Sequence, residues 1–474
     1  MASGRRTLLN GATVIPMTAA HPRDLRAAIN GAALLIEDDR IVTLAAADEA
    51  PALTRSMQAA VTRGEAVEIV SLDGCIIIPG LVNAHMHTWQ TALRGVAANW
   101  TLLEYFGKMH TGLATVFEPA DLHIATLCGA LNQINCGTTT LADWCHNNRT
   151  PEHNDAAIDG LLASGIRSVF FHGTPKPEPK PGETPFWERM HPRAELERLI
   201  HERATGQPLL RIAAAILGPH YSTMDVALHD FRMAHELGVI ASMHQGGGPA
   251  RTPLGWAQLE AEGLLGPQIN IVHGHALSDQ QLARFAGLGM SFSVAAESEM
   301  SQGHGHPITG RLRALGHAPS LGIDLESVAS GDMLSQARIA LGMQRSLDNE
   351  AARAKTGTMP ATSSVAVYEA LDWVTRAGAR MLGLDDQIGT LEPGKQADLV
   401  VIDANALNMQ PVHDAVASVV FQTSLANIRD VMIAGRWQKR GGHLLGAGSA
   451  ERLPQLRRSL VASGQKIVRA LHLH

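Results

Sequence analysis

The fold of this chain is decided by the stretch PGLVNAHMH at residues 79–87. It follows the apolar run at residues 75–78, which predicts a buried strand. Side chains two positions apart on a strand point the same way, so His85 and His87 should project together from the strand's end. Two imidazoles on one face make half of a zinc-type site. Because His-x-His pairs also arise by chance, the rest of the chain must supply the other half.

From residue 85 onward, predicted strands alternate with predicted helices, for example the helices at residues 121–135 and 223–236. The strand candidates lie at residues 138–143, 166–172, 211–217, 239–244, 268–273, 290–294 and 318–324. Together with the strand that leads to His87, they make about eight β-α units, the number in a closed parallel barrel. A doubly wound open sheet is the alternative, but it usually has a Gly-rich phosphate fingerprint after its first strand, which is missing here. The sequence therefore predicts an α/β protein built on a (β/α)8 TIM-type barrel.

Strand-like segments flank the barrel at both ends of the chain. They lie at residues 7–15, 33–36, 40–44 and 67–72, and again at 397–402, 416–421 and 428–433, after a long helix expected at 364–381. We predict that both sets form one small composite β-sandwich domain. Its first part is residues 1–78, the barrel is residues 79–384, and its second part with the C-terminal tail is residues 385–474.

Composition and charge argue against several classes of protein. The chain has 474 residues, a formal net charge of −6 and 45% hydrophobic residues, which is ordinary for a globular protein with a large core. Its mild acidity gives no reason to expect nucleic acid or an anionic membrane as a partner. We see no secretory signal or membrane span, and the four cysteines form no CxxC pair. We therefore expect a cytoplasmic protein with reduced thiols and a small-molecule substrate.

Several predicted strands end in a residue that can bind a metal or transfer a proton. The first strand leads to His85 and His87, the fifth to His244, the sixth to His273 and the eighth to Asp324. One such histidine can simply cap a carbonyl group, but the C-terminal ends of barrel strands meet at one rim, where active sites lie. Three neutral imidazoles and a carboxylate suit Zn²⁺ or Fe²⁺, which lowers the pKa of a bound water to about 7. A carboxylate beside that water can accept its proton.

These motifs resemble the amidohydrolase superfamily, and within it the cytosine deaminase and chlorohydrolase-like branch that includes S-adenosylhomocysteine deaminase-like proteins. The stretch PGLVNAHMHTWQTALRG at residues 79–95 looks like the branch's PGxxNxHxHxxQxxxRG pattern. Further matches along nearly the whole chain are GTTTLAD at 137–143, GPHY at 218–221, SMH at 242–244, HGHALSD at 273–279, SLGID at 320–324 and IGTLEPGKQADLVVID at 388–403.

The resemblance implies that one divalent metal ion, Zn²⁺ or alternatively Fe²⁺, is held by His85, His87, His244 and Asp324. It further implies that Asp324 accepts a proton from water and that His273 polarises the attacked centre. Gln90 is expected to face the substrate, and His220 to lie in the substrate pocket. Binuclear members carry a carboxylated lysine at strand four, and the absence of lysine from residues 211–221 implies a single metal ion.

One departure from the family pattern concerns proton transfer. Deaminases of this branch normally read His-x-x-Glu at strand five, with the Glu protonating the substrate's ring nitrogen, but here Gly247 stands at the Glu position. The strand-seven region departs as well, with AESEM at residues 296–300. We hypothesise that Glu297 or Glu299 supplies the missing carboxylate. A solvated acidic loop is the alternative.

Other residues are candidates for the substrate pocket. His304 or His306, in the GHGHP segment after strand seven, would line it, and His146 lies just past strand two. Trp89 would stack on a planar substrate, although a tryptophan in this place often only packs. The Pro-rich residues 174–185 predict an exposed loop, with a lid over the barrel mouth as the alternative.

The leading interpretation is a mononuclear metal-dependent hydrolase that deaminates an amino-substituted nitrogen heterocycle. A first alternative keeps the metal site but cleaves a cyclic amide, a carbon–chlorine bond or a carbon–sulfur bond. A second alternative is a non-catalytic relative that serves as a binding module, against which the retention of all the ligand positions argues. The resemblance also implies a homo-oligomer, a dimer or larger.

Overall fold

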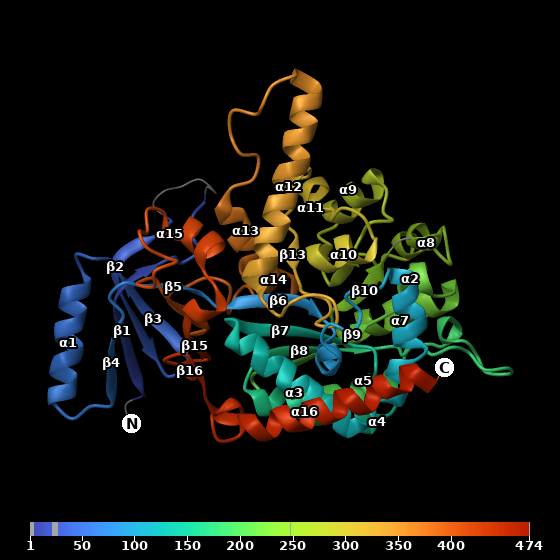
Figure 1. Ribbon diagram of the computed structural model, residues 1–474, viewed down its shortest axis with the longest axis horizontal. Coiled ribbons are helices and arrows are strands. Elements are labelled where there is room, and N and C mark those ends of the chain that lie inside the picture. The colour runs from blue at the N-terminus through green and yellow to red at the C-terminus, as the bar shows by residue number, and fades with distance from the viewer. Residues whose placement is uncertain (1–3, 21–26, 247, 474) are drawn as a thin grey trace. The chain divides into compact units, whose positions relative to one another are not determined.

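The computed structural model describes residues 4–20, 27–246 and 248–473, which form two compact units (Figure 1). Unit 1 comprises Met1–Val82, Gln133–Thr140 and Asp332–Ala450. Unit 2 comprises Asn83–Asn132, Leu141–Gly331 and Glu451–His474. The domain boundaries expected from the sequence stay predictions.

Unit 1 contains a mixed sheet that draws strands from both ends of the sequence. Its strand order is β17-β16-β15-β14-β5-β1-β2-β3, with β4 beside β1. The strands are β1 (Arg6–Val14), β2 (Ile29–Glu37), β3 (Arg40–Ala45), β4 (Val67–Ser71), β5 (Cys75–Pro79), β14 (Leu399–Asp403), β15 (Ile428–Ile433), β16 (Arg436–Arg440) and β17 (His443–Leu444). Antiparallel pairing of β5 with β14 joins the N-terminal and C-terminal strands. The predicted companion β-domain from both termini is thus confirmed.

The barrel sheet has the order β13-β12-β11-β10-β9-β8-β7-β6. Its strands are β6 (Leu81–Met86), β7 (Thr138–Cys145), β8 (Arg167–Gly173), β9 (Leu210–Ala215), β10 (Ala241–Gln245), β11 (Ile269–His273), β12 (Ser291–Val294) and β13 (Ser320–Leu321). Parallel pairing runs from β8 through to β13. A parallel bridge joins Met86, at the end of β6, to Asp324, which lies three residues beyond β13, so the barrel is nearly closed. The predicted TIM-type barrel is confirmed.

Helices alternate with the barrel strands, as parallel connections require. Those in the segments of unit 2 are α2 (Leu102–Tyr105), α3 (Pro119–Asn135), α4 (Pro151–Ser164), α5 (Arg193–Arg198), α6 (Gly218–Tyr221), α7 (Met224–Leu237), α8 (Gly255–Ala261), α9 (Asp279–Gly287), α10 (Ala296–Gln302), α11 (Thr309–Ala314) and α16 (Leu453–Val468). Those of unit 1 are α1 (Ala50–Thr62), α12 (Met333–Thr356), α13 (Val367–Trp373), α14 (Arg376–Met381) and α15 (Ala415–Ala417).

The strand assignment around residue 80 was wrong in one respect. The apolar run at residues 75–78 belongs to β5 of the unit 1 sheet, and the histidine-bearing barrel strand is β6. Gly80 separates the two strands, and a side chain there would collide with Thr139. Because both strands are buried along their whole length, hydrophobicity alone does not mark the break between them.

Two further local predictions were wrong. The single helix expected at residues 364–381 is divided into α13 and α14 at Thr375, whose backbone is not helical. The strand expected at residues 416–421 is helical, in α15 and the π-helical turn Ser418–Gln422. Short apolar runs fit a buried helix as well as a strand. As expected, the four cysteines are free. None of the helices in the described part of the chain combines the length and apolar character that crossing a bilayer demands.

Candidate metal centre

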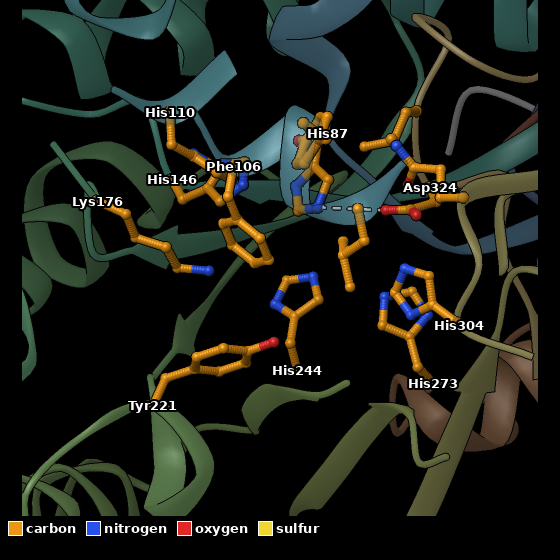
Figure 2. Close-up of a pocket in the computed structure, with 14 residues that line it drawn as sticks. His87, Phe106, His110, His146, Lys176, Tyr221, His244, His273, His304 and Asp324 are labelled. Atoms are coloured by element: carbon orange, nitrogen blue, oxygen red, sulfur yellow. Dashed lines mark ion pairs between the residues drawn. The ribbon is translucent and has the colours of Figure 1, made fainter. Parts of the chain in front are cut away.

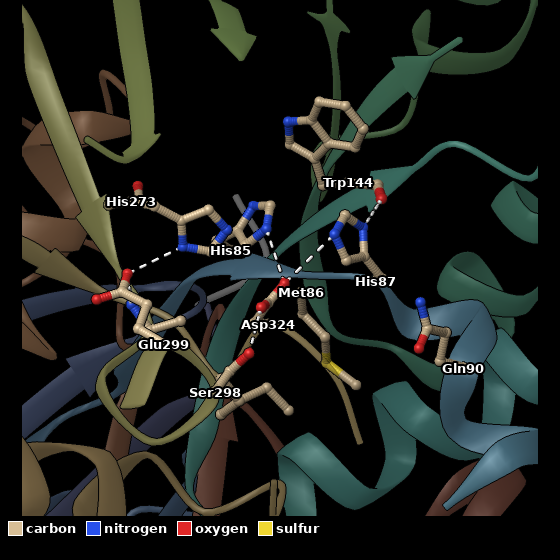
Figure 3. A network of polar contacts seen from close by, with 12 residues as sticks. His85, Met86, His87, Gln90, Trp144, His273, Ser298, Glu299 and Asp324 are labelled. Carbon is tan, nitrogen blue, oxygen red and sulfur yellow. Dashed lines mark hydrogen bonds and ion pairs between the residues drawn. The ribbon is translucent and has the colours of Figure 1, made fainter. Parts of the chain in front are cut away.

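The four predicted metal ligands come together at the C-terminal ends of the barrel strands. One ligand atom each from His85, His87, His244 and Asp324 lies within 4.8 Å of the others, and all four residues are buried. The Asp324 Oδ1 atom lies 3.3 Å from the Nε2 atoms of both His85 and His87 (Figure 3). The prediction that these strand ends converge on one another is confirmed by this geometry.

Backbone hydrogen bonds between the first and last strands hold this cluster. The amide of His87 donates to the carbonyl of Asp324 over 2.7 Å, and the amide of Asp324 donates to the carbonyl of His85 over 3.0 Å. Asn83 Oδ1 accepts from the amides of His85 and Ile323, each over 3.3 Å. Asp324 has a φ of +65°, a left-handed conformation that aspartate tolerates better than most residues. The ligands therefore project from a fixed framework, and little reorganisation is needed to bind an ion.

Gly322 allows β13 to approach β6 this closely. A Cβ atom at residue 322 would lie 2.7 Å from the His85 amide nitrogen and 2.8 Å from the His85 Cβ. Gly322→Ala should therefore destabilise the protein by about 1–3 kcal/mol, through overpacking against the backbone, and lower the Tm in calorimetry. Gly287→Ala in α9 is the matched control, since its Cβ would meet nothing within 4 Å. Equal Tm values for the two variants would contradict this expectation.

The protonation states of the histidines favour metal binding. Burial, the largest influence, lowers the pKa of His87 to about 3. Burial also lowers the pKa values of His85 and His244. All three imidazoles are therefore neutral near pH 7 and keep a lone pair. The Nδ1 atom of His87 lies 2.6 Å from the carbonyl oxygen of Trp144, which leaves its Nε2 to face Asp324.

Unsatisfied polar atoms also fit a metal ion. The His85 Nε2 atom, which faces Asp324, and the His244 Nδ1 atom are buried and have no hydrogen-bond partner among the described residues. Such atoms are costly unless a ligand meets them. Burial raises the pKa of Asp324, but its contacts with His85 and other histidines outweigh this and lower the pKa below its usual range. Its second oxygen accepts a 2.6 Å hydrogen bond from Ser298, which orients the carboxylate. The donor set therefore suits Zn²⁺ or Fe²⁺.

His273 and Glu299 form a buried pair beside the cluster. The Nδ1 atom of His273 lies 2.9 Å from Glu299 Oε1, which also accepts a 2.9 Å hydrogen bond from the amide of Ala295 (Figure 3). Burial lowers the pKa of His273, but the hydrogen bond to Glu299 and the charge of Asp324 outweigh it, so the pKa is raised overall. His273 is therefore suited to hold or donate a proton beside the cluster.

A small pocket of about 30 Å³ opens in front of the cluster (Figure 2). It is bordered by histidines, aromatic rings and a lysine, together with a few aliphatic and amide side chains. The lining residues are His87, Leu102, Tyr105, Phe106, His110, His146, Lys176, Tyr221, His244, His273, Gln302, His304, Asp324 and Leu325.

Two of the predicted substrate residues, His146 and His304, line this pocket. The His146 ring stacks on His87 with ring centroids 4.1 Å apart. Trp89 lies behind His146, donating its Nε1–H to the His146 Nδ1 over 3.1 Å, and packs against Phe117. Trp89 therefore supports the pocket wall instead of forming it.

The remaining predicted residues lie outside the lining. Gln90 donates to the Tyr105 hydroxyl over 2.5 Å, so it orients a lining residue. His220 is buried next to the pocket residue Tyr221, with ring centroids 4.5 Å apart. His306 is exposed and Glu297 is half-buried, and neither is among the lining residues. Glu299 reaches the site through His273, and Gly247 lies outside the described residues.

Sequence reasoning missed most of the wall opposite Asp324. Lys176 comes from the Pro-rich loop that was expected to be exposed, and Tyr105, Phe106 and His110 come from the segment after β6. Lys176 is buried, whereas residues 178 and 180–184 of the same loop are exposed. The one feature of the sequence that could have indicated Lys176 as a pocket residue is its position. It lies three residues beyond the end of β8, on the rim where barrel sites form.

Comparisons with known proteins agree with this architecture. Residues 76–438 match the family model described as Amidohydrolase family. The chain is 29% identical over 440 residues to the 8-oxoguanine deaminase of Pseudomonas aeruginosa, covering 87% of this chain and 90% of that protein. It is 28% identical over 385 residues to the 5-methylthioadenosine/S-adenosylhomocysteine deaminase of Syntrophobacter fumaroxidans, covering 78% and 82% of the two chains.

Solved structures share the fold over nearly the whole chain. An adenosine deaminase from Xanthomonas campestris with bound zinc superposes with a TM-score of 0.77 at 22% identity, covering all of both chains. A mutant atrazine chlorohydrolase from Arthrobacter aurescens, complexed with zinc and atraton, gives a TM-score of 0.79 at 19% identity and covers 97% of this chain and all of that one. At these identities the likeness establishes the fold.

Proposed function

The chain belongs to the amidohydrolase family, and from this premise we propose that it deaminates an amino-substituted nitrogen heterocycle by hydrolysis. The observation that carries the proposal is the buried group His85, His87, His244 and Asp324, which faces a pocket beside the His273–Glu299 pair. The deaminase names of the two relatives support the choice of bond.

We assign one divalent metal ion to these four residues. Zinc is the first choice because the two solved neighbours carry it, and Fe²⁺ fits the same donors. When bound, such an ion supplies a Lewis acid and lowers the pKa of a coordinated water to about 7.

The chain's own residues supply the proton transfers. Asp324, whose pKa is held low, accepts a proton from the attacking water. His273 faces the pocket and stabilises the charge that develops on the attacked ring. A carbon–oxygen bond then forms, the carbon–nitrogen bond breaks, and ammonia leaves with the proton that Asp324 accepted. The second proton of the water ends on a ring nitrogen of the product. The balanced reaction consumes one water and yields a ring oxo group and ammonia.

The His273–Glu299 pair takes the place of the strand-five glutamate in this proposal. Glu299 is fully buried behind His273, so it positions that ring and stabilises its proton without touching substrate. Glu297 lies on the same helix but outside the pocket lining. Of the two glutamates that the sequence left open, the proposal therefore relies on Glu299.

The test is ammonia release from a panel of aminated pyrimidines, purines, pterins and triazines, with the metal content of the protein measured first. We expect at least one compound to release ammonia, because a metal ion held by three neutral imidazoles and one carboxylate can activate water near pH 7. Dialysis against a chelator should abolish the release, and added Zn²⁺ or Fe²⁺ should restore it. No ammonia from fully metallated protein would contradict deamination, and chloride release from chlorinated rings would favour the alternative hydrolase.

A further inference from the structure

The pocket contains a buried ammonium group that the proposed reaction does not use. Lys176 is 6% exposed and lines the pocket. Its Nζ atom lies 5.1 Å from the ring centroid of Tyr221 and 5.8 Å from those of Phe106 and Trp144. Aromatic faces stabilise a cation, but they leave its hydrogen-bond donors free for another partner.

Lys176 forms no ion pair with a carboxylate in the part of the chain that the structure describes. Burial lowers its pKa to about 8, and the charge of Asp324 opposes that shift. An ammonium that is buried without a counter-ion destabilises a protein. A lysine in this setting is therefore suited to meet a negative or strongly polar group that a ligand brings.

The position of Lys176 indicates which part of a ligand it would meet. Figure 2 shows Lys176 on the side of the pocket opposite Asp324 and His304. A ring whose amino-bearing carbon faces Asp324 would turn its far edge toward the Lys176 Nζ. The Phe106 and Tyr221 rings, with centroids 6.2 Å apart, border the path between them and suit a flat ligand.

Contacts with neighbouring residues hold the start of the loop at residues 174–185 in place. The Lys176 side chain therefore lies in the pocket before any substrate binds. Thr174 is buried with its hydroxyl 3.5 Å from the His191 Nδ1, and the His191 Nε2 lies 2.9 Å from the Nδ1 of His172 at the end of β8. The amide of His191 in turn donates to Asp230 over 2.9 Å. These contacts hold the chain two residues before Lys176 and pre-organise the ammonium group.

We propose that Lys176 determines specificity by binding an oxygen that bears negative charge on the substrate edge opposite the amino group. The substrate class is a planar amino-heterocycle that also carries a ring oxo or carboxylate oxygen. This inference rests on the proposed function, because it places the amino group at the metal cluster.

The kinetic test compares substrates that differ at one ring position. One pair is ammeline, which carries an oxo group where melamine carries an amino group, and melamine itself; another is an aminopyrimidine with and without a carboxylate. Lys176→Met should lower kcat/KM for the oxygen-bearing member by about 10- to 100-fold, which corresponds to the free energy of one lost charge-assisted hydrogen bond. The kcat/KM for the other member should stay nearly unchanged. Lys180→Met is the matched control, since Lys180 is exposed in the same loop. An equal loss for both members, or a lower metal content or Tm, would assign Lys176 a structural role and overturn the proposal.

A binding test separates this inference from the reaction itself. Barbiturate is a planar ring anion without an amino group, and its Kd for metal-loaded protein can be measured by calorimetry. Lys176→Met should raise that Kd by about 10- to 100-fold, and Lys176→Arg should raise it less because the charge remains. If Lys176→Met loses barbiturate binding but the wild-type protein releases no ammonia, deamination is refuted and the anion site at Lys176 is still supported. Unchanged binding in Lys176→Met would overturn the inference even where ammonia is released.

Discussion

Asp324→Asn should reduce turnover by about 10³-fold or more while the protein keeps its fold. Asparagine has the size of aspartate, so the backbone bonds between Asp324, His85 and His87 can persist. The substitution removes the charge that would bind the metal and the base that would accept the proton from water. The neutral amide also cannot keep the Oδ2 contact with Ser298 in its charge-assisted form.

Two measurements check this result. Ammonia release gives kcat, and elemental analysis gives the metal bound per chain, which should fall together with activity because a ligand is lost. Asp279→Asn is the control, since that carboxylate is 90% exposed and pairs with Arg311 at the surface. Full activity of Asp324→Asn with normal metal content would refute the assignment of this residue as ligand and base.

The metal cluster could be predicted from sequence because it depends on two simple regularities. Parallel strands bring their C-terminal ends to one rim. His85, His244, His273 and Asp324 each lie within three residues of such an end. Each ligand can therefore be identified from the sequence around it. The distances between the ligands cannot, because they depend on how the strands pack. The same argument explains why the barrel itself was predictable, since alternation of strand and helix is visible along the chain.

The opposite wall of the pocket follows from packing that the local sequence does not encode. Lys176 is buried, and two residues before it the hydroxyl of the buried Thr174 lies 3.5 Å from the Nδ1 of His191. Composition indicated an exposed loop, which is true of residues 178 and 180–184 but not of Lys176. In the same way, Tyr105 lines the pocket without a motif of its own. Gln90 donates to its hydroxyl, and the expectation that Gln90 faces the substrate stays a prediction.

The choice between Glu297 and Glu299 likewise needed the structure. In sequence they are two residues apart in one acidic segment, and an exposed loop was as reasonable as a site. Two residues along helix α10 correspond to a rotation of about 200°, so the two side chains point to nearly opposite faces of the helix. When one side chain is buried against the site, the other points away from it. Helix formation therefore places Glu299 against His273 and leaves Glu297 half-buried.

Glu299→Gln should lower kcat by about 10²-fold while KM and metal content stay close to those of the wild type. Glutamine keeps the size of the side chain and an oxygen that can accept from the Ala295 amide, so α10 should keep its place. It removes the negative charge that stabilises a proton on His273. The loss should therefore fall on the chemical step instead of on substrate binding.

Glu297→Gln is the matched control, because it makes the same chemical change two residues away on the same helix and should keep wild-type kcat. Glu299→Asp adds a second comparison, since it restores the charge on a shorter side chain and should recover part of the lost turnover. A structural role for Glu299 would predict equal damage from the Gln and Asp variants together with a lower Tm. Wild-type kcat in both Gln variants would show that neither carboxylate supports the proton transfer, and the His273–Glu299 pair would then be only part of the packing around the metal cluster.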